Sequence, residues 1–464
     1  MVIIAIQYSL RTVKINFVNR NHRGLLFRMI IAAVIFGITY LAIAMSRIPS
    51  AIIAILGATA MVTALAILSD FTPHEALQYV DLEVIFLLAG MMVLADVMSR
   101  TGAFEWAARQ GARLVKGNGF FLIILLSLIT AVGSALLDNV TTVVIMVPIT
   151  LSLCKSLDLN PIPFLLAEVY ASNIGGTATI VGDPPNIIVA SQANISFSEF
   201  FINMAPVSAL SLCALFILLY LWFKNSVTVN PLKREQLMSE HPTNLIKDSN
   251  LLKKSLFVFT LTIIGFFFAD QIGISPAFVA IGGAALVLLF SGLNPGEVLK
   301  EVEWTTLCFF AGLFMLVGGL EHVGIIDRIS EWIVSLASNS DGTITRESER
   351  NLSIIMVWLS GGLSAFIDNI PFATTMTPVV SDLLSTNEAM NSGNSTNPLW
   401  WALTLGADLG GNFTIVGASA NVVVFTMARA SGYPISFFQF FKYGAVISVV
   451  SLAISCGYIL LRYY

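Results

Sequence analysis

Long apolar runs, separated by short polar segments, fill the chain from residue 29 onward. A membrane-spanning helix needs about 20 mainly apolar residues, and it excludes charged side chains because a charge in hydrocarbon is costly. The pattern therefore predicts an all-α, polytopic membrane protein. The runs that fit this template are Met29–Met45, Ile48–Leu68, Glu83–Met98, Pro206–Phe223, Ser255–Phe268, Ser275–Phe290, Trp304–Leu320 and Tyr443–Leu461.

Other apolar stretches are interrupted by Asp, Asn, Gly and Pro. Within a bilayer each backbone N–H and C=O must find a partner inside the protein, so an interrupted helix must face protein or a watery cavity. We interpret these stretches as re-entrant helical hairpins and broken helices. They are Phe120–Cys154, Pro163–Ser191, Ile354–Leu384 and Trp400–Ala430.

The two halves of the chain share a series of motifs in the same order. Ser134-Ala-Leu-Leu-Asp-Asn139 matches Ser364-Ala-Phe-Ile-Asp-Asn369. Gly175-Gly-Thr-Ala-Thr-Ile-Val-Gly182 matches Gly410-Gly-Asn-Phe-Thr-Ile-Val-Gly417. A series of this kind indicates duplication, with about five spanning helices in each repeat. The predicted segments are a basic N-terminal extension (1–28), a first transmembrane repeat (29–223), a cytoplasmic linker (224–254) and a second transmembrane repeat (255–464).

The charges of two matching polar segments predict how the repeats are oriented. Arg100–Lys116 is basic, whereas its counterpart Glu321–Arg350 is mainly acidic. Because basic segments favour the cytoplasmic side, the two lie on opposite sides and the second repeat is inverted. The spans before Arg100 then place the N-terminus outside, but the basic residues of 1–28 favour the inside, so its side stays open.

Composition supports the membrane class and excludes several others. The 464 residues are 56% hydrophobic and 11% charged, whereas soluble globular proteins carry about 25% charged residues. No basic stretch interleaved with aromatic residues suggests nucleic-acid binding. The four cysteines form no Cys-x-x-Cys pair, and no Gly-x-x-x-x-Gly-Lys-Ser/Thr phosphate loop is present. We expect no cofactor, no metal cluster of His or Cys, and no enzymatic activity.

The Asp-Asn pairs of the two hairpins carry the first candidate chemistry. A helix end exposed at a hairpin tip attracts anions at its N–H end and cations at its C=O end. A carboxylate, an amide and a hydroxyl add oxygen ligands suited to Na⁺, or they form a proton site. The alternative is that each aspartate only caps a helix. The residues predicted to bind substrate or ion here are Ser134, Asp138, Asn139, Thr141, Ser364, Asp368 and Asn369.

The glycine motifs that follow the hairpins carry the second candidate chemistry. Gly182-Asp-Pro-Pro-Asn186 must break a helix because proline lacks a backbone donor. Asp183 has Ala418 as its counterpart, so the two halves should differ in charge. A plain loop is the alternative. The predicted site residues here are Thr179, Gly182, Asp183, Asn186, Thr414, Gly417 and Asn421, and the candidate Na⁺ sites are Ser134, Asp138, Asn139 and Gly182, and Ser364, Asp368, Asn369 and Gly417.

Glu168 and Asp408 are further acids in apolar surroundings, just before the two glycine pairs. A buried carboxyl can exchange protons in the working pH range, which makes both residues candidate proton carriers. A structural role, with hydrogen bonds to the broken backbone, is equally compatible with the sequence.

Two strings resemble the ion transporter superfamily: Leu137-Asp-Asn-Val-Thr-Thr142 and Asn173-Ile-Gly-Gly-Thr-Ala-Thr-Ile-Val-Gly-Asp-Pro-Pro-Asn186. They are most similar to the arsenite permease and pink-eyed-dilution P protein branch, which is related to citrate and dicarboxylate–sodium symporters and to Na⁺/H⁺ antiporters. The resemblance implies a homodimer, with a scaffold part and a moving part in each protomer. Dicarboxylate relatives carry Ser-Asn-Thr at the tips, where this chain has Asp-Asn-Val and Asp-Asn-Ile, which argues against dicarboxylate transport.

We therefore predict a secondary active transporter that works by alternating access and is coupled to Na⁺ or H⁺. Its expected substrate is a small inorganic or organic anion, or arsenite or antimonite. A Na⁺/H⁺ antiporter is the alternative, and an intramembrane aspartyl hydrolase, which needs two carboxyls about 3 Å apart, is a remote one. We expect a multi-pass protein of the plasma (inner) membrane whose partners are the lipid bilayer and a small-molecule or ion substrate.

Overall fold

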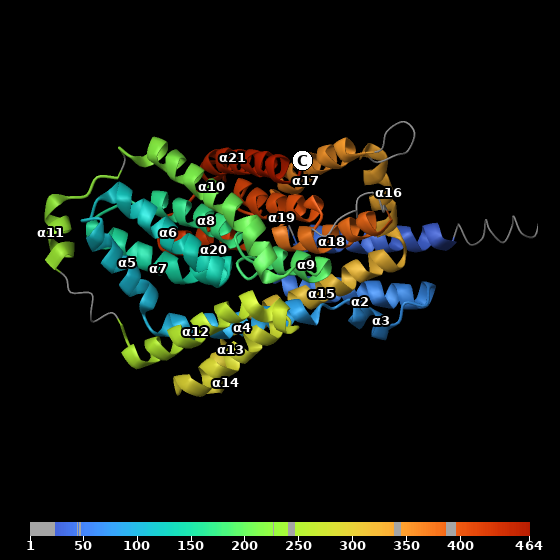
Figure 1. The fold of residues 1–464 in the computed structure, drawn as a ribbon, viewed down its shortest axis with the longest axis horizontal. Helices are drawn as coiled ribbons and strands as arrows, with labels where there is room; N and C mark the ends of the chain where they lie inside the picture. The colour runs from blue at the N-terminus through green and yellow to red at the C-terminus, as the bar shows by residue number, and fades with distance from the viewer. Residues whose placement is uncertain are drawn as a thin grey trace, which may run out of the picture. The chain divides into compact units, whose positions relative to one another are not determined.

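The structure is a computed structural model that describes residues 24–43, 45, 48–225, 227–239, 246–337, 345–386 and 396–464. Over these residues the chain is helical and contains no β-strand (Figure 1). Among them, nine helices are long and apolar enough to cross a membrane. The prediction of an all-α, multi-pass membrane protein is therefore confirmed.

One compact unit combines segments from both halves of the sequence, up to Asp81 and from Thr305 to Leu336. Its helices are Gly24–Ile43, α2 (Ser50–Leu68), α3 (Pro73–Gln78), α15 (Trp304–His322) and α16 (Ile325–Ala337). Here α2 and α15 pack closely: a Cβ added to Gly312 would lie only 2.8 Å from the carbonyl carbon of Ala54.

The second compact unit runs from Leu82 to Trp304 and from Ala337 to Tyr464. Figure 1 shows its helices α6, α8 and α10 side by side. Its elements are α4 (Leu82–Arg100), α5 (Ala103–Leu114), α6 (Gly119–Leu136), α7 (Asn139–Leu157), α8 (Ile162–Gly176), α9 (Pro184–Ala193), α10 (Phe197–Phe223), α11 (Pro231–Ser239), α12 (Ser249–Ala269), η2 (Asp270–Ile272), α13 (Pro276–Ser291), α14 (Pro295–Lys300), α17 (Arg346–Ser364), α18 (Asn369–Thr386), α19 (Pro398–Gly410), η4 (Gly411–Phe413), α20 (Ser419–Ala430) and α21 (Phe437–Tyr463).

Packing between helices repeats as the sequence motifs do. In the second unit, a Cβ on Gly90 of α4 would lie 2.7 Å from the carbonyl carbon of Ala280 on α13. This is the same contact that Gly312 of α15 makes with Ala54 of α2 in the first unit. Glycines permit this close approach of helices in membranes. The duplicated motifs therefore lie on helices that also make matching contacts.

The helices that carry the site motifs repeat in the same way. A Cβ on Gly175 of α8 would lie 2.1 Å from the carbonyl oxygen of Ala131 on α6, and one on Gly410 of α19 would lie 2.5 Å from the carbonyl oxygen of Gly361 on α17. Backbone therefore touches backbone in both pairs, which holds each hairpin firmly against its broken helix.

Two of the predicted spans are too short. The last helix of each half begins earlier than its apolar run, at Phe197 for α10 and at Phe437 for α21. The reason is local capping, because the hydroxyls of Ser196 and Ser436 accept hydrogen bonds from the first turns. Because the first turns of α10 and α21 contain polar residues, the apolar runs begin later than the helices do.

Other boundaries also differ from the expected ones. The first apolar helix begins at Gly24, inside the expected extension 1–28. The expected linker 224–254 contains α11 and the start of α12. An N-capping aspartate, Asp248, starts α12 before its apolar run begins.

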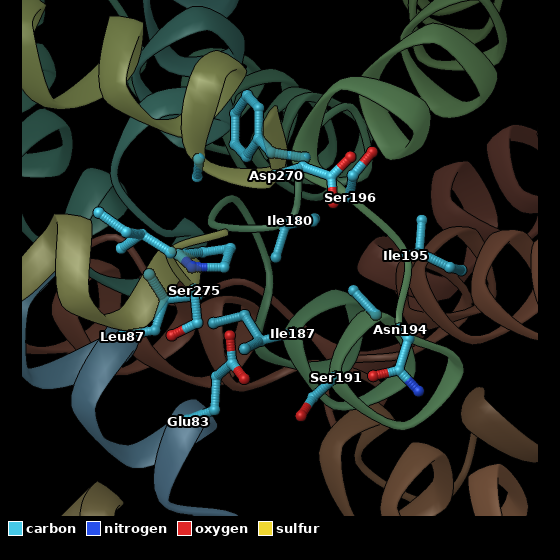
Figure 2. A pocket seen from close by; sticks show the side chains of 15 residues that line it. Glu83, Leu87, Ile180, Ile187, Ser191, Asn194, Ile195, Ser196, Asp270 and Ser275 are labelled. Atoms are coloured by element: carbon cyan, nitrogen blue, oxygen red, sulfur yellow. The ribbon is translucent and has the colours of Figure 1, made fainter. Parts of the chain in front are cut away.

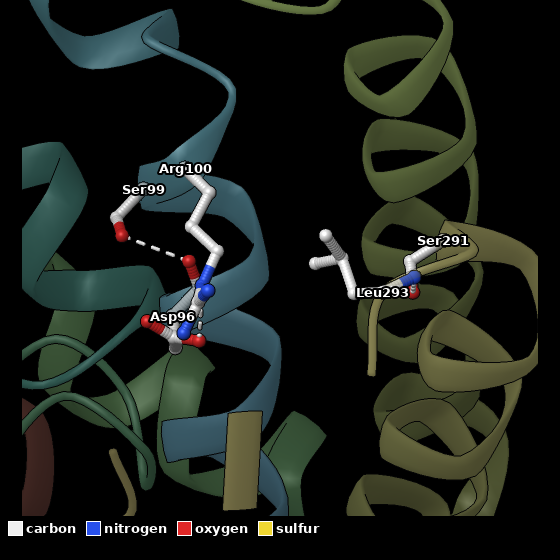
Figure 3. Close-up of polar contacts among 5 residues, drawn as sticks. All are labelled: Asp96, Ser99, Arg100, Ser291 and Leu293. Atoms are coloured by element: carbon white, nitrogen blue, oxygen red, sulfur yellow. Dashed lines mark hydrogen bonds and ion pairs between the residues drawn. The ribbon is translucent and has the colours of Figure 1, made fainter. Parts of the chain in front are cut away.

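An ion pair lies at the C-terminal end of α4 (Figure 3). The Nε of Arg100 donates to Oδ2 of Asp96 at 2.8 Å, and the hydroxyl of Ser99 donates to the carbonyl oxygen of Asp96 at 2.8 Å. A cation in the last turn also complements the helix dipole. The carboxylate of Asp96 is therefore paired with Arg100 of the same helix, and Asp96 lies outside the duplicated motifs.

The close approach of α6 and α8 predicts a stability effect for Gly175→Ala. The added methyl group would force two backbones apart, so we expect unfolding to become easier by about 1–3 kcal/mol. The measurement is thermal unfolding of the purified protein in detergent. Gly457→Ala in α21 is the matched control, because its Cβ meets nothing within 4 Å. Equal stability of Gly175→Ala and the wild type would refute the packing described here.

Candidate functional site

Each hairpin tip is closed by an aspartate that caps the second arm. Asp138 lies between α6 and α7, and its Oδ1 accepts from the backbone N–H of Thr141 at 2.8 Å. Asp368 lies before α18, where its Oδ1 accepts from the N–H of Ile370 at 3.1 Å and its Oδ2 from the hydroxyl of Ser419 at 2.7 Å. The capping role left open by the sequence is therefore present at both tips.

The asparagines that follow these caps point to a shared partner. The Nδ2 of Asn139 donates to Oδ2 of Asp183 at 2.7 Å. The Nδ2 of Asn369 lies 3.2 Å from both oxygens of the same carboxylate. All three side chains are buried, with Asp183 only 1% exposed. One carboxylate therefore joins the hairpins of both halves, and the amides meet there rather than the tip aspartates.

The broken helices are held in shape by two equivalent asparagines. The Nδ2 of Asn186 donates to the carbonyl oxygens of Gly176 at 3.0 Å and Thr179 at 2.9 Å. The Nδ2 of Asn421 makes the matching pair of bonds in the second half, at 2.7 and 2.8 Å. These bonds satisfy backbone groups that the helix break leaves free, as a membrane interior requires.

Hydroxyl groups tie each hairpin to its broken helix. Ser134 Oγ donates to the carbonyl oxygen of Ser172 at 2.7 Å, and Ser364 Oγ to that of Ala407 at 2.6 Å. Thr179 and Thr414 make a second matching pair, donating to the carbonyls of Ala135 and Ala365. The predicted Na⁺ sites include Ser134 and Ser364, whose hydroxyl protons are used here to hold the two arms together.

The glycines at the breaks bring two backbone segments into contact. A Cβ on Gly182 would lie 2.3 Å from the carbonyl oxygen of Gly176, and one on Gly417 would lie 2.7 Å from that of Gly411. Any larger residue would push the turn open. The break therefore depends on glycine for space rather than for a left-handed backbone.

The two candidate proton carriers lie in different surroundings, and both are fully buried. Glu168 on α8 accepts a 2.5 Å hydrogen bond from the hydroxyl of Thr150 on α7. Asp408 on α19 faces the side chains of Thr177 and Asn186 in the broken segment of the first half. Asp408 is also near enough to Asp183 for their charges to interact.

A residue that sequence reasoning passed over is Asn173, at the start of the string that carries the resemblance. Its Nδ2 donates to Oδ1 of Asn412 and of Asn421, both at 2.8 Å, across the two halves. Its counterpart at the glycine-pair offset is Asp408 (173 + 235 = 408). An alignment of the two glycine motifs could have identified Asn173, because it pairs this asparagine with an acid, Asp408.

The electrostatic character of the site is acidic. Among the described residues, the charges that act on Asp183 are those of Asp408, Asp368 and Asp138. A cavity of about 230 Å³ adjoins the broken segment, where Ile180 and Ile187 line it (Figure 2). Two more acids, Glu83 and Asp270, stand on its wall.

A model of the family described as a citrate transporter, CitMHS, matches residues 40–406. This stretch includes both hairpin tips and Asp183. The chain belongs to the CitMHS family. Membership also confirms the predicted resemblance to the ion transporter superfamily.

Relatives of this CitMHS chain are transporters and membrane proteins. A Mycobacterium tuberculosis protein named only as an uncharacterized transporter is 41% identical over 437 residues, which covers 94% of this chain and 99% of the relative. The 46 kDa membrane protein of Mycobacterium leprae is 41% identical over 436 residues, with the same coverage. The human P protein is 34% identical over 508 residues, covering 93% of this chain and 60% of that protein.

Two solved transporters share the fold. The Alcanivorax borkumensis YdaH transporter matches with a TM-score of 0.58 and 12% identity, covering 94% of this chain and 98% of that one. Neisseria gonorrhoeae MtrF, described among antimetabolite efflux pumps, matches with a TM-score of 0.60 and 10% identity over 94% of each chain. At these identities the likeness concerns architecture alone.

The contact between Asp183 and Asn139 predicts energetic coupling between the residues. In a double-mutant cycle of Asp183→Ala and Asn139→Ala, we expect a coupling free energy of about 0.5–3 kcal/mol, because each single change strands a buried polar group. The measurement is the free energy of unfolding of the four proteins. The Asp96–Arg100 pair, which is partly exposed, is the control and should couple by less than about 1 kcal/mol. Additive effects at Asp183 and Asn139 would contradict the contact.

Proposed function

We propose that this CitMHS transporter is a secondary active transporter that works by alternating access and is driven by a Na⁺ or H⁺ gradient. The observation that carries the proposal is the carboxylate of Asp183, held by one amide from each hairpin tip. Broken helices at equivalent places in two repeats are a strong pointer to a transporter's binding site. Substrate binds between the two hairpin tips, and the moving part of the protomer carries it across against a fixed scaffold part.

The charge of the site limits the substrate. The charges of Asp138, Asp368 and Asp408 act on Asp183 at the junction. A multiply charged anion would be repelled unless protons or cations bind with it. We therefore propose a small organic or inorganic anion taken with cations, or a neutral species such as arsenite or antimonite. The family description favours an organic anion of the citrate kind.

A Na⁺/H⁺ antiporter is the second candidate. It is favoured by the same set of buried carboxylates, because carboxylate oxygens bind Na⁺ and H⁺ directly and in competition. An aspartyl hydrolase has less support, since Asp138 and Asp368 each cap their own helix and the relatives are transporters. By the resemblance, we further propose a homodimer in the plasma membrane.

The capping aspartates predict a loss of transport. Asp138→Ala and Asp368→Ala each remove the acceptor that fixes a tip, at a cost of about 0.5–2 kcal/mol. We expect the displaced asparagines to reduce flux at least tenfold while membrane insertion is retained. The measurement is a flux screen in proteoliposomes under imposed Na⁺ or pH gradients, with citrate, arsenite and Na⁺ as probes.

The control for this screen is Asp158→Asn, since Asp158 is exposed and caps the far end of α7 in a left-handed conformation that asparagine tolerates. It should transport like the wild type. Full flux by both tip variants would reject the assignment of the tips to the transport site.

A further inference from the structure

The two halves make matching polar contacts with each other, and the two sets differ at two of their three positions, Asn173 against Asp408 and Asn412 against Thr177. In one direction, Asn173 of the first half reaches Asn412 and Asn421 of the second. In the other, Asp408 of the second half faces Thr177 and Asn186 of the first. Each residue of one set stands 235 positions from its counterpart (408 − 173, 412 − 177 and 421 − 186).

In the first of these clusters the oxygens of Asn412 and Asn421 that face Asn173 each receive a hydrogen, although the Oδ1 of Asn173 and the Nδ2 of Asn412 have no partner. Asn173 supplies two amide hydrogens, and each lies on a side-chain oxygen at 2.8 Å. The amide hydrogens of Asn421 bind backbone carbonyls, so its oxygen is free to accept. The orientation of both amides follows from these partners.

In the second cluster no donor hydrogen is left for the facing oxygens of Asp408 and Asn186. Both amide hydrogens of Asn186 bind backbone carbonyls, and the hydroxyl of Thr177 donates to the carbonyl oxygen of Asn173. Neither oxygen of Asp408 nor the Oδ1 of Asn186 receives a hydrogen bond. Both residues have no exposed surface. An ionised carboxylate only accepts hydrogen bonds, and the two nearby donors, Thr177 and Asn186, already direct their hydrogens to backbone carbonyls.

We propose that Asp408 is the binding site of the coupling proton. A proton that binds the ionised carboxylate gives the neutral acid, whose O–H donates to Oδ1 of Asn186. This hydrogen takes the place that an amide hydrogen of Asn173 holds in the other cluster. The proton enters from water when the site is open to one side and returns to water on the other.

A proton fits this cluster better than Na⁺. The equivalent gap beside Asn173 is bridged by a hydrogen between atoms 2.8 Å apart, which is hydrogen-bond spacing. Glu168 fits the role less well, because its Oε1 already has Thr150 as a donor and only its Oε2 lacks a partner, whereas both oxygens of Asp408 lack one. The residue at the equivalent position of the second half is apolar. Glu168 therefore belongs to none of the matching contacts between the halves.

The position of Asp408 explains how a proton drives transport, and this part rests on the proposed function. Asp408 acts electrostatically on Asp183, the residue that joins the two tips. Protonation removes one negative charge from the site, so an anionic substrate binds the protonated form more readily. Linked binding of this kind is reciprocal, so the substrate also favours the proton.

The test is infrared difference spectroscopy of the purified full-length protein in lipid, recorded while the pH is changed with H⁺ as the only ligand. We expect a protonated-carboxyl band in the wild type that Asp408→Asn lacks and that Glu168→Gln retains. Asp408→Glu keeps a carboxyl, and it should shift the band because the longer side chain alters its hydrogen bond. An unchanged spectrum in Asp408→Asn, or an unshifted band in Asp408→Glu, would overturn the proposal.

A transport experiment then separates this proposal from the proposed function. Proteoliposomes receive citrate or arsenite under an imposed pH gradient. Asp408→Asn should exchange the transported probe down its own gradient but accumulate at least tenfold less than the wild type. Accumulation equal to the wild type would reject Asp408 as the coupling site. If the wild type moves neither probe, the substrate assignment fails while the infrared result still decides whether Asp408 holds a proton.

Discussion

Inside a membrane, every polar group of an interrupted helix needs a partner from the protein, and Asp183 meets this need for both halves at once. Its carboxylate accepts from Asn139 and Asn369, while Asn186 and Asn421 pair the backbone at the two breaks. The hairpins and broken helices are therefore parts of one hydrogen-bonded structure.

The two halves make matching contacts, but their acidic residues differ. Matching glycines place α6 on α8 and α17 on α19, and matching hydroxyls tie the same pairs together. The acids do not match, since Asp183 has Ala418 as its counterpart and Asp408 has Asn173. Matching contacts in the two halves therefore surround an asymmetric set of charges.

Much of this could be predicted from the sequence, because apolar runs and repeated motifs report directly on spans and duplication. The helix starts at Phe197 and Phe437 could not, since serine caps extend those helices into polar sequence. The sequence also could not predict which residue of each Asp-Asn pair caps its own helix and which one binds Asp183. This depends on the direction of each side chain, which the sequence does not show. The importance of Asn173 was visible only in the alignment of the halves, and its partners are far away in the chain.

Access from both sides is the central claim, and it can be measured at Ile180, a cavity-lining residue beside the break. In a variant whose four native cysteines are replaced, Ile180→Cys would be exposed to a membrane-impermeant thiol reagent in oriented vesicles under opposite pH gradients. The account predicts that reversing the gradient changes the side from which the reagent reacts faster. Reaction from one side only, at a rate that the gradient leaves unchanged, would contradict it.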